Sequence, residues 1–246
     1  MVHTDFFVES FRIKKGEKKQ DMEGHTAPIL KIIVLEPTKM SKETGDKILD
    51  DPKVVTCAHD NTIMLWDYTK MEVISKMQAP PHSEITCMTF LYGCCLVATG
   101  HEDGSIRLWN LEINTSVLLK CNEESKHTNT ISCIKGVNWK DSEILLCGSY
   151  DGHISNWEIS EPKRGGSAVN STIFPQQRQF IDNTRNKVPR FYDNEKDTDE
   201  ILVLNFYEKP EDEEGKTSEE GFIIVGGNNR AIQVYSIRTG ILVTQM

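Results

Sequence analysis

The chain has 246 residues, of which 38% are hydrophobic and 26% are charged, so it carries enough apolar material for a substantial core. A formal net charge of −9 argues against general nucleic-acid binding, because phosphate binding needs a basic face. The N-terminus lacks a basic segment followed by an apolar run, and no stretch reaches the roughly 20 apolar residues of a membrane span. We therefore expect a globular, cytoplasmic protein that binds neither nucleic acid nor membrane.

Residues 1–23 form an N-terminal segment with one predicted strand and one basic cluster. The strand covers residues 6–13 (F-F-V-E-S-F-R-I) and is interpreted as the outer strand of a preceding structural unit. Four lysines follow at positions 14, 15, 18 and 19, with Glu17 between them. We interpret them as a solvated loop, and the alternative is a surface that attracts an acidic partner or a phosphate.

Three later segments repeat one pattern of strand, tight turn and strand: Thr56–Asp67, Thr99–Asn110 and Cys147–Glu158. Their turns carry Asp-Asn or Asp-Gly, the residues that tolerate a positive φ in a two-residue hairpin. Trp109 follows Trp66 by 43 residues and Trp157 follows Trp109 by 48, which is the length expected of a four-stranded propeller blade. The sequence therefore predicts an all-β protein built from propeller blades.

Four such blades are recognisable, and we assign them residues 24–80, 81–126, 127–160 and 200–246. Residues 161–199 are rich in Gly, Pro, Asn and Gln, and we predict an insertion with room for one outer strand. The fourth blade is degenerate, because Tyr235 stands in place of the Trp and an acidic loop interrupts it at 208–221. The predicted strands are 29–35, 53–58, 62–68, 72–76, 85–90, 94–99, 105–111, 116–121, 131–139, 143–149, 153–159, 200–207, 222–227, 231–237 and 241–245.

The seven cysteines fall in or beside these predicted strands, at positions 57, 87, 94, 95, 121, 133 and 147. They form no C-x-x-C pair, and no His lies at metal-ligand spacing from them. We expect small, reduced core residues, with no metal and no cofactor.

The repeats resemble the WD-repeat propeller family, with the Trp-Asp signature intact at Trp66-Asp67 and relaxed at Trp109-Asn110 and Trp157-Glu158. The resemblance covers residues 24 to 246. In that family a hydrogen-bonded relay runs within a blade from the Trp indole to a Ser or Thr hydroxyl, a His imidazole and the Asp of the tight turn. Such a set lets half-apolar side chains pack while their buried polar atoms satisfy one another.

The resemblance implies a complete relay in each of the first two blades. Their members are Trp66, Thr56, His25 and Asp60 in the first blade, and Trp109, Thr99, His82 and Asp103 in the second. The third blade keeps Trp157, His127 and Asp151, but Cys147 at the hydroxyl position should weaken its relay. The fourth blade has Val225, Asn229 and Tyr235 without a His, so we expect packing alone to hold it.

Family members usually bind partners on the top face, at the opening of the innermost strand and at the residue just before the turn Asp. The corresponding positions are Pro28, Glu84, Thr130 and Glu200 at the openings, and His59, Glu102, Tyr150 and Asn228 before the turns. Tyr150 is the hot-spot candidate, since an exposed aromatic side chain is a common anchor, and the alternative is a solvated surface Tyr. Phe191 and Tyr192 in the insertion are further candidates for covering an apolar surface, either of this propeller or of a partner.

No catalytic residue is expected. The nearest approach to a hydrolytic set is His101-Glu102-Asp103, whose neighbouring side chains on a tight turn point in different directions and cannot converge on one atom. The sequence also has no Gly-rich phosphate loop, nucleophile elbow or metal cluster.

Propellers of this family commonly close with seven blades, and four blades leave edges and apolar faces open. We therefore expect part of a larger propeller that needs further blades from a longer chain or a partner. The favoured function is a non-catalytic scaffold that binds other proteins, and the style of the repeats resembles large WD-repeat proteins of cilia, flagella and the axoneme. The alternative is a ubiquitin-ligase adaptor that reads phosphorylated peptides, which predicts an Arg cluster that the top-face positions lack.

Overall fold

The computed structural model describes residues 6–12, 17–35, 52–140, 142–160, 174–182, 199–209 and 220–246. Most of these residues lie in β-strands, and the helical element among them is a single 3-10 turn, η3 (Glu123–Ser125). Across these ranges we find no helix with the length and apolar character needed to cross a bilayer. The predicted all-β fold class is confirmed.

Sixteen of the strands form four antiparallel sheets of four, which we call blades 1 to 4. Blade 1 contains β3 (Ile29–Leu35), β4 (Lys53–Ala58), β5 (Thr62–Asp67) and β6 (Glu72–Gln78). Blade 2 contains β7 (Ile85–Leu91), β8 (Leu96–His101), β9 (Ile106–Asn110) and β10 (Thr115–Leu118). Blade 3 contains β11 (Ile131–Trp139), β12 (Ser142–Ser149), β13 (His153–Ser160) and β14 (Phe174–Asp182). Blade 4 contains β15 (Ile201–Glu208), β16 (Gly221–Gly227), β17 (Ile232–Ser236) and β18 (Leu242–Gln245).

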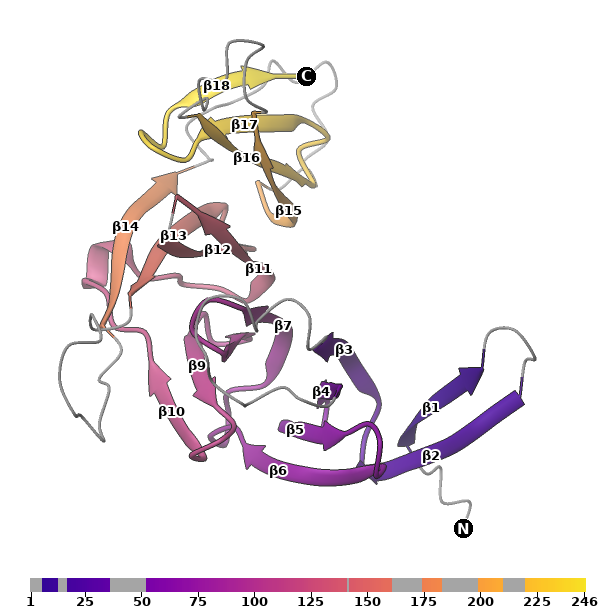
Figure 1. Ribbon diagram of the computed structural model, residues 1–246. Coiled ribbons are helices and arrows are strands. Elements are labelled where there is room, and N and C mark those ends of the chain that lie inside the picture. The colour runs from indigo at the N-terminus through magenta and orange to yellow at the C-terminus, as the bar shows by residue number, and fades with distance from the viewer. Residues whose placement is uncertain are drawn as a thin grey trace, which may run out of the picture.

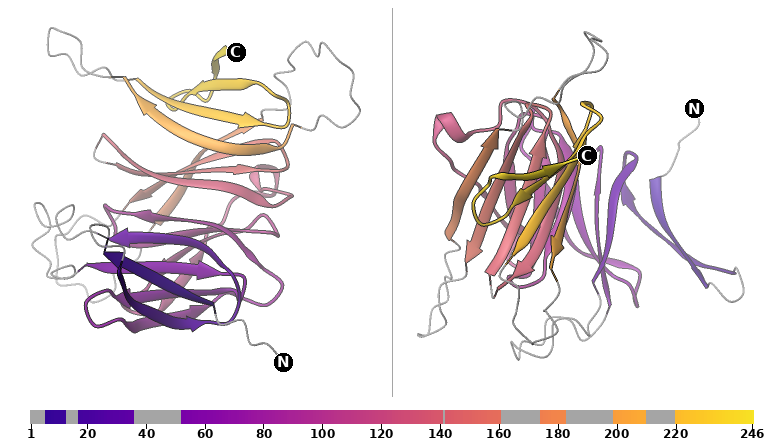
Figure 2. Two further views of the ribbon diagram at one scale, coloured as in Figure 1. Left: turned by 90° about the vertical axis from the view of Figure 1, so that its right-hand side faces the viewer. Right: turned by 90° about the horizontal axis from the view of Figure 1, so that it is seen from above.

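The blades follow one another along an arc that is open on one side (Figure 1). The first strands of the blades, β3, β7, β11 and β15, lie on the inside of the arc, and the fourth strands lie on the outside. Figure 2 shows the four sheets stacked face to face. The outer strand of blade 3, β14, comes from the stretch that the sequence predicted to be an insertion with room for one strand.

The core lies between consecutive blades. Val55 and Leu65 of blade 1 pack with Val97 and Trp109 of blade 2, and similar clusters join blade 2 to blade 3 and blade 3 to blade 4. All six residues of β5 are buried, because this strand has another sheet on each side of its own. Apolar burial between sheets therefore holds the arc together.

Each inner strand has a one-residue irregularity in its pairing just after its first residue, and the residues there are Leu30, Thr86, Ser132 and Leu202. In blade 2 the Thr86 hydroxyl reaches the Gly100 carbonyl of its own blade at 3.0 Å and the Ile131 carbonyl of blade 3. Ser132 makes the equivalent contacts with Gly148 and with Ile201 of blade 4. The irregularity thus directs a hydroxyl towards the next blade at two of the three junctions.

The N-terminal strand is half of a hairpin. The strands β1 (Phe6–Arg12) and β2 (Glu17–His25) form a two-stranded sheet of their own. The predicted loop around Lys18 and Lys19 is therefore wrong, since both lysines lie in β2, whereas Lys14 and Lys15 lie outside the described residues. The run K-K-Q-D lacks the apolar alternation by which a strand is recognised, so periodicity could not find it.

The outward faces of the two end blades are only partly covered. Met22 of β2 is buried against Met64 and Trp66, so the hairpin covers part of the outward face of blade 1. On the same face Ile32 and Val34 are 45% and 55% exposed. Blade 4 exposes 64% of Val203 and 49% of Ile232 on the face turned away from blade 3. These apolar side chains occupy positions that pack against a neighbouring sheet elsewhere in the arc.

Candidate functional site

In blade 1 a chain of hydrogen bonds links four residues from four separate positions in the sequence. The Trp66 Nε1–H donates to Thr56 Oγ1 at 2.8 Å, and Thr56 Oγ1 lies 2.6 Å from His25 Nε2. His25 Nδ1 lies 3.1 Å from the Asp60 carboxylate in the turn between β4 and β5. These distances fit an Nδ1–H that donates to Asp60 and an Nε2 that accepts from the Thr56 hydroxyl. The structure brings together all four residues that the resemblance implied.

The electrostatics of this set favour a neutral imidazole beside a carboxylate. Burial lowers the pKa of His25, and the hydrogen bond and charge of Asp60 only partly oppose that effect. Burial raises the pKa of Asp60, but hydrogen bonds from the Thr62 hydroxyl and from the Thr26 and Thr62 amides outweigh it, so the net pKa is lowered. The set therefore acts as a hydrogen-bonded support for Trp66.

Blade 2 has a relay in which the sequence prediction named the wrong His. The Trp109 Nε1–H donates to Thr99 Oγ1 at 2.7 Å, and Thr99 Oγ1 lies 2.8 Å from Nε2 of His101, at the end of β8. His101 Nδ1 lies 2.9 Å from the Ser83 carbonyl oxygen. Asp103 is not hydrogen-bonded to this His and accepts the Ser105 amide at 2.9 Å within the turn.

His82 is exposed and has a φ of 63°. It precedes the first residue of its inner strand, Ile85, by three positions, whereas His25 and His127 precede Ile29 and Ile131 by four. That difference of one residue places His82 outside the blade. The fully buried His of blade 2 is His101, the first residue of the His101-Glu102-Asp103 run.

Blade 3 has a complete relay, contrary to the prediction that Cys147 would weaken it. The Trp157 Nε1–H donates to Ser155 Oγ at 2.9 Å, and Ser155 Oγ lies 2.9 Å from His127 Nε2. His127 Nδ1 lies 3.1 Å from Asp151. The sequence analysis missed Ser155, although it stands two positions before Trp157 on one strand and so shares its face of the sheet.

Blade 4 has no His in its sequence, and Tyr235, which replaces the Trp, is fully buried. Two positions before it, buried Gln233 lies 3.4 Å from the Asn229 amide and 3.5 Å from the Gln245 side chain. The Asn229 side chain accepts the Ala231 amide at 3.1 Å. Long polar contacts therefore supplement the packing, and the prediction of packing alone was incomplete.

The predicted partner-binding residues of the top face meet in pairs. In every blade the amide of the residue before the turn donates to the carbonyl of the residue that opens the inner strand. The pairs are His59 with Pro28 at 2.9 Å, Glu102 with Glu84 at 2.9 Å, Tyr150 with Thr130 at 3.0 Å and Asn228 with Glu200 at 3.1 Å. Phe191 and Tyr192 lie outside the described residues.

The side chains of these pairs differ in their availability. Pro28, His59, Glu84 and Glu102 are exposed, and Tyr150 is 38% exposed. The Thr130 hydroxyl donates to the Glu102 carbonyl at 3.2 Å, and the Asn228 amide donates to the Glu200 carboxylate. The exposed members on blades 1 to 3 therefore make up the part of the top face that is open to a partner.

Burial lowers the reactivity of three of the cysteine thiols. Burial raises the pKa of the Cys57 and Cys87 thiols to about 12 and that of Cys133 to about 11, so these groups stay protonated. Among the described residues no group of three or more His, Cys, Asp or Glu side chains is placed to hold a metal ion.

Comparison with known proteins agrees with this geometry. The family model described as "WD domain, G-beta repeat" matches residues 16–67, 73–110 and 120–158. The chain is 26% identical over 125 residues to "Periodic tryptophan protein 2" of Arabidopsis thaliana, covering 51% of this chain and 13% of that protein. It is 25% identical over 165 residues to "Ribosome biogenesis protein WDR12 homolog" of Aedes aegypti, covering 59% and 36%.

A further relative is "Protein transport protein SEC13-2" of Candida glabrata, which is 22% identical over 191 residues, covering 74% of this chain and 56% of that protein. The chain thus spans between 13% and 56% of the length of these three relatives. The three matched repeats, each of which ends one residue after a Trp whose indole donates to a buried hydroxyl, show that the chain belongs to the WD-repeat β-propeller family.

Proposed function

We propose that this chain is a non-catalytic scaffold that holds other proteins together through its top face. WD repeats imply a protein-interaction scaffold, and the observation that carries the finer proposal is the fixed pairing of the top-face positions. The same backbone hydrogen bond, between 2.9 and 3.1 Å, recurs in all four blades. This bond fixes the backbone of one residue from each turn and of the residue just before each inner strand. Because the backbone is fixed before a partner binds, the entropic cost of binding is lower.

The exposed side chains favour a partner segment with basic and apolar character. Glu84 and Glu102 are adjacent in blade 2 and exposed, so they attract a cation. Tyr150 of blade 3 offers a partly exposed ring as an anchor. The absence of Arg from the eight top-face positions disfavours the alternative of an adaptor that reads phosphorylated peptides.

The finer setting rests on the relatives' names, two of which refer to ribosome biogenesis or protein transport. We propose a ribosome-assembly complex as the first setting to test. A ciliary setting remains a prediction from the style of the repeats, and cytoplasmic localisation also remains a prediction. We further propose that additional blades, from a longer chain or a partner, cover the exposed Ile32 and Val34 of blade 1 and Val203 of blade 4.

The proposed scaffold function is tested by proximity labelling in cells. The set of labelled proteins is compared between the wild-type chain and two double variants. We expect Tyr150→Ala with Glu102→Lys to lose labelled proteins that the matched outer variant Ser116→Ala with Glu112→Lys retains. Ribosome-assembly factors among them would support the first setting, axonemal proteins the second, and ligase subunits the adaptor. Equal labelling by both variants, with unchanged melting temperatures, would contradict the top face as the binding surface.

A further inference from the structure

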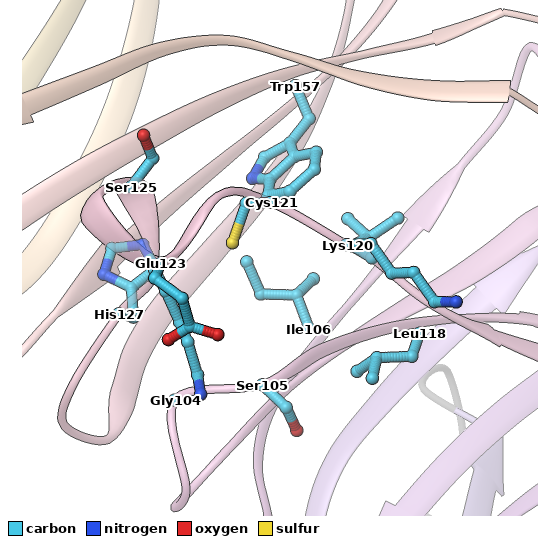
Figure 3. Close-up of a pocket in the computed structure, with 12 residues that line it drawn as sticks. Gly104, Ser105, Ile106, Leu118, Lys120, Cys121, Glu123, Ser125, His127 and Trp157 are labelled. Atoms are coloured by element: carbon cyan, nitrogen blue, oxygen red, sulfur yellow. The ribbon is translucent and has the colours of Figure 1, made fainter.

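A pocket of about 260 Å³ lies between blades 2 and 3 (Figure 3), and none of the eight top-face residues lines it. Its inner wall is formed by Ile106, Leu119 and Trp157, all buried members of the core cluster between these blades. Its rim carries Lys120, Glu123 and Lys126, whose side chains are exposed. The pocket is therefore apolar inside and charged at the mouth.

The pocket depends on the long connection from β10 to β11. The length of this connection can be compared between blades by counting from the outer-strand residue that pairs with the residue two positions before the Trp. In blade 1 that residue is Lys76, the partner of Met64, and β7 begins nine positions later at Ile85. In blade 2 the equivalent residue is Leu118, the partner of Arg107, and β11 begins thirteen positions later. The longer connection contains η3 and forms one wall of the pocket.

A hydrogen bond joins this wall of the pocket to blade 3. The Gln177 amide of β14 donates to the Ser125 carbonyl of η3 at 2.9 Å. The thiol of Cys121 points into the pocket (Figure 3), and burial raises its pKa, so the group facing the pocket is neutral. The pocket is thus a fixed, largely preformed cavity with an apolar lining.

The charges at the mouth have no ion-pair partner within the described part of the chain. Lys120, Lys126 and Glu123 make no salt bridge there with a described residue. Lys120 lies on one side of the mouth and Glu123 on the other (Figure 3). If a molecule binds in the pocket, a carboxylate on it would therefore be attracted to the Lys120 side of the mouth and repelled from the Glu123 side.

The neighbouring strand offers an edge to the same occupant. β10 is the outermost strand of blade 2, its four residues are exposed, and among the described strands it pairs with β9 alone. A free strand edge pairs readily with an extended segment. Leu118, at the end of β10, lines the pocket, so a segment that follows this edge leads to its mouth.

We propose that this pocket binds one large apolar side chain of an extended segment from a protein partner, with a neighbouring carboxylate of that segment paired to Lys120. The cavity is smaller than the roughly 300 to 1,000 Å³ of sites for drug-sized ligands, which suits a single aromatic anchor. The pocket lining contains none of the eight top-face residues, and neither proposal requires the other.

The test titrates the full chain with two blocked dipeptides, N-acetyl-Asp-Trp-amide and N-acetyl-Lys-Trp-amide, and follows the NMR signals of the four Trp indole groups and the backbone. We expect the Asp peptide to shift the signals of Trp157 and of residues 120–126 saturably and to bind more tightly than the Lys peptide. Cys121→Phe, which fills the pocket, should weaken binding at least about tenfold. Glu72→Phe, at an exposed position on β6 of blade 1, should leave it unchanged.

Lys120→Glu provides a second variant at an exposed position, in case Cys121→Phe does not fold. It should reverse the preference between the two peptides. The proposal is overturned by the absence of saturable shifts, by shifts confined to top-face residues, or by binding that neither a folded Cys121→Phe nor Lys120→Glu alters. Because the readout lies at Trp157, failure here would leave the labelling test of the top face untouched.

Discussion

Blades 2 and 3 bury the same kind of Trp but support its indole by different routes. In blade 2 the hydroxyl comes from Thr99 on the second strand, and the His comes from the end of that strand. In blade 3 the hydroxyl comes from Ser155 on the third strand, and His127 comes from the connection before the blade. The requirement is therefore a hydroxyl at one buried point, which side chains from two neighbouring strands can reach.

The most severe test of this comparison removes the His from blade 2. His101→Ala should lower the free energy of unfolding by about 3 kcal/mol, because it opens a cavity and leaves the Thr99 hydroxyl and the Ser83 carbonyl without their partner. His82→Ala, at an exposed position, should stay within about 0.5 kcal/mol of wild type. Urea unfolding of both variants measures this difference in the free energy of unfolding. Equal losses of stability in the two variants would contradict the assignment of His101 to the relay.

A second experiment moves the hydroxyl of blade 3 to the strand used in blade 2. Ser155→Ala should cost about 2 kcal/mol, since the Trp157 indole N–H loses its acceptor. Cys147 precedes Trp157 by ten positions, as Thr99 precedes Trp109, so Cys147→Ser in the Ser155→Ala background should restore about 1 kcal/mol. Both values come from denaturant unfolding, and no recovery would show that the two routes are not interchangeable.

The pH dependence of stability tests the burial of His101 in blade 2. Burial lowers the pKa of His101 below its usual 6.5, although the Ser83 carbonyl and Asp103 oppose this. The unfolded chain therefore takes up a proton as the pH falls through about 6.5, whereas the folded chain does not, so stability is lost on acidification.

Between pH 7.5 and 5.5 the free energy of unfolding should fall with a slope of up to about 1.4 kcal/mol per pH unit for each such His. His101→Asn should have a smaller slope than wild type. Buried Glu143 has a pKa raised by burial and acts in the opposite sense, but it is present in both proteins and cancels from the comparison. Identical slopes in the two proteins would contradict the assignment.

The smallest expected effect concerns the hydroxyls between blades. Thr86→Val should cost about 1 kcal/mol, because the Ile131 carbonyl of blade 3 loses its donor while the volume of the side chain is kept. Thr115→Val, at an exposed position on β10, is the matched control and should change little. The two variants are compared by their melting temperatures, and indistinguishable values would mean that apolar burial alone joins blades 2 and 3.

These comparisons also separate what the sequence could predict from what it could not. The Trp period and the Asp-Gly turns predicted the blades, because both depend on local spacing that a strand and a tight turn preserve. The top-face positions came from the family resemblance, and their backbone pairing was not predicted. The His of blade 2 was missed because one residue fewer before Ile85 redirects His82. Ser155 was missed because the hydroxyl was expected ten positions before the Trp, where blade 3 has Cys147. Side chains alternate between the two faces along β13, so Ser155 lies on the same face as Trp157 and next to Cys147.

The pocket beside Trp157 could not be predicted from any pattern. It arises from the meeting of η3, β9 and blade 3, which lie apart in sequence, and from a connection four residues longer than that of blade 1. The β2 strand was missed for a different reason, since its polar residues give no apolar alternation.

The central claim, that the top face binds proteins, is tested most directly by photo-crosslinking in cells. A benzophenone amino acid placed at Tyr150 should give discrete crosslinked species, each containing a second protein, whereas the same amino acid at exposed Val73 on β6 should give none of them. Crosslinked species that are identical at both positions, or that are absent at Tyr150 in a correctly folded chain, would contradict the account.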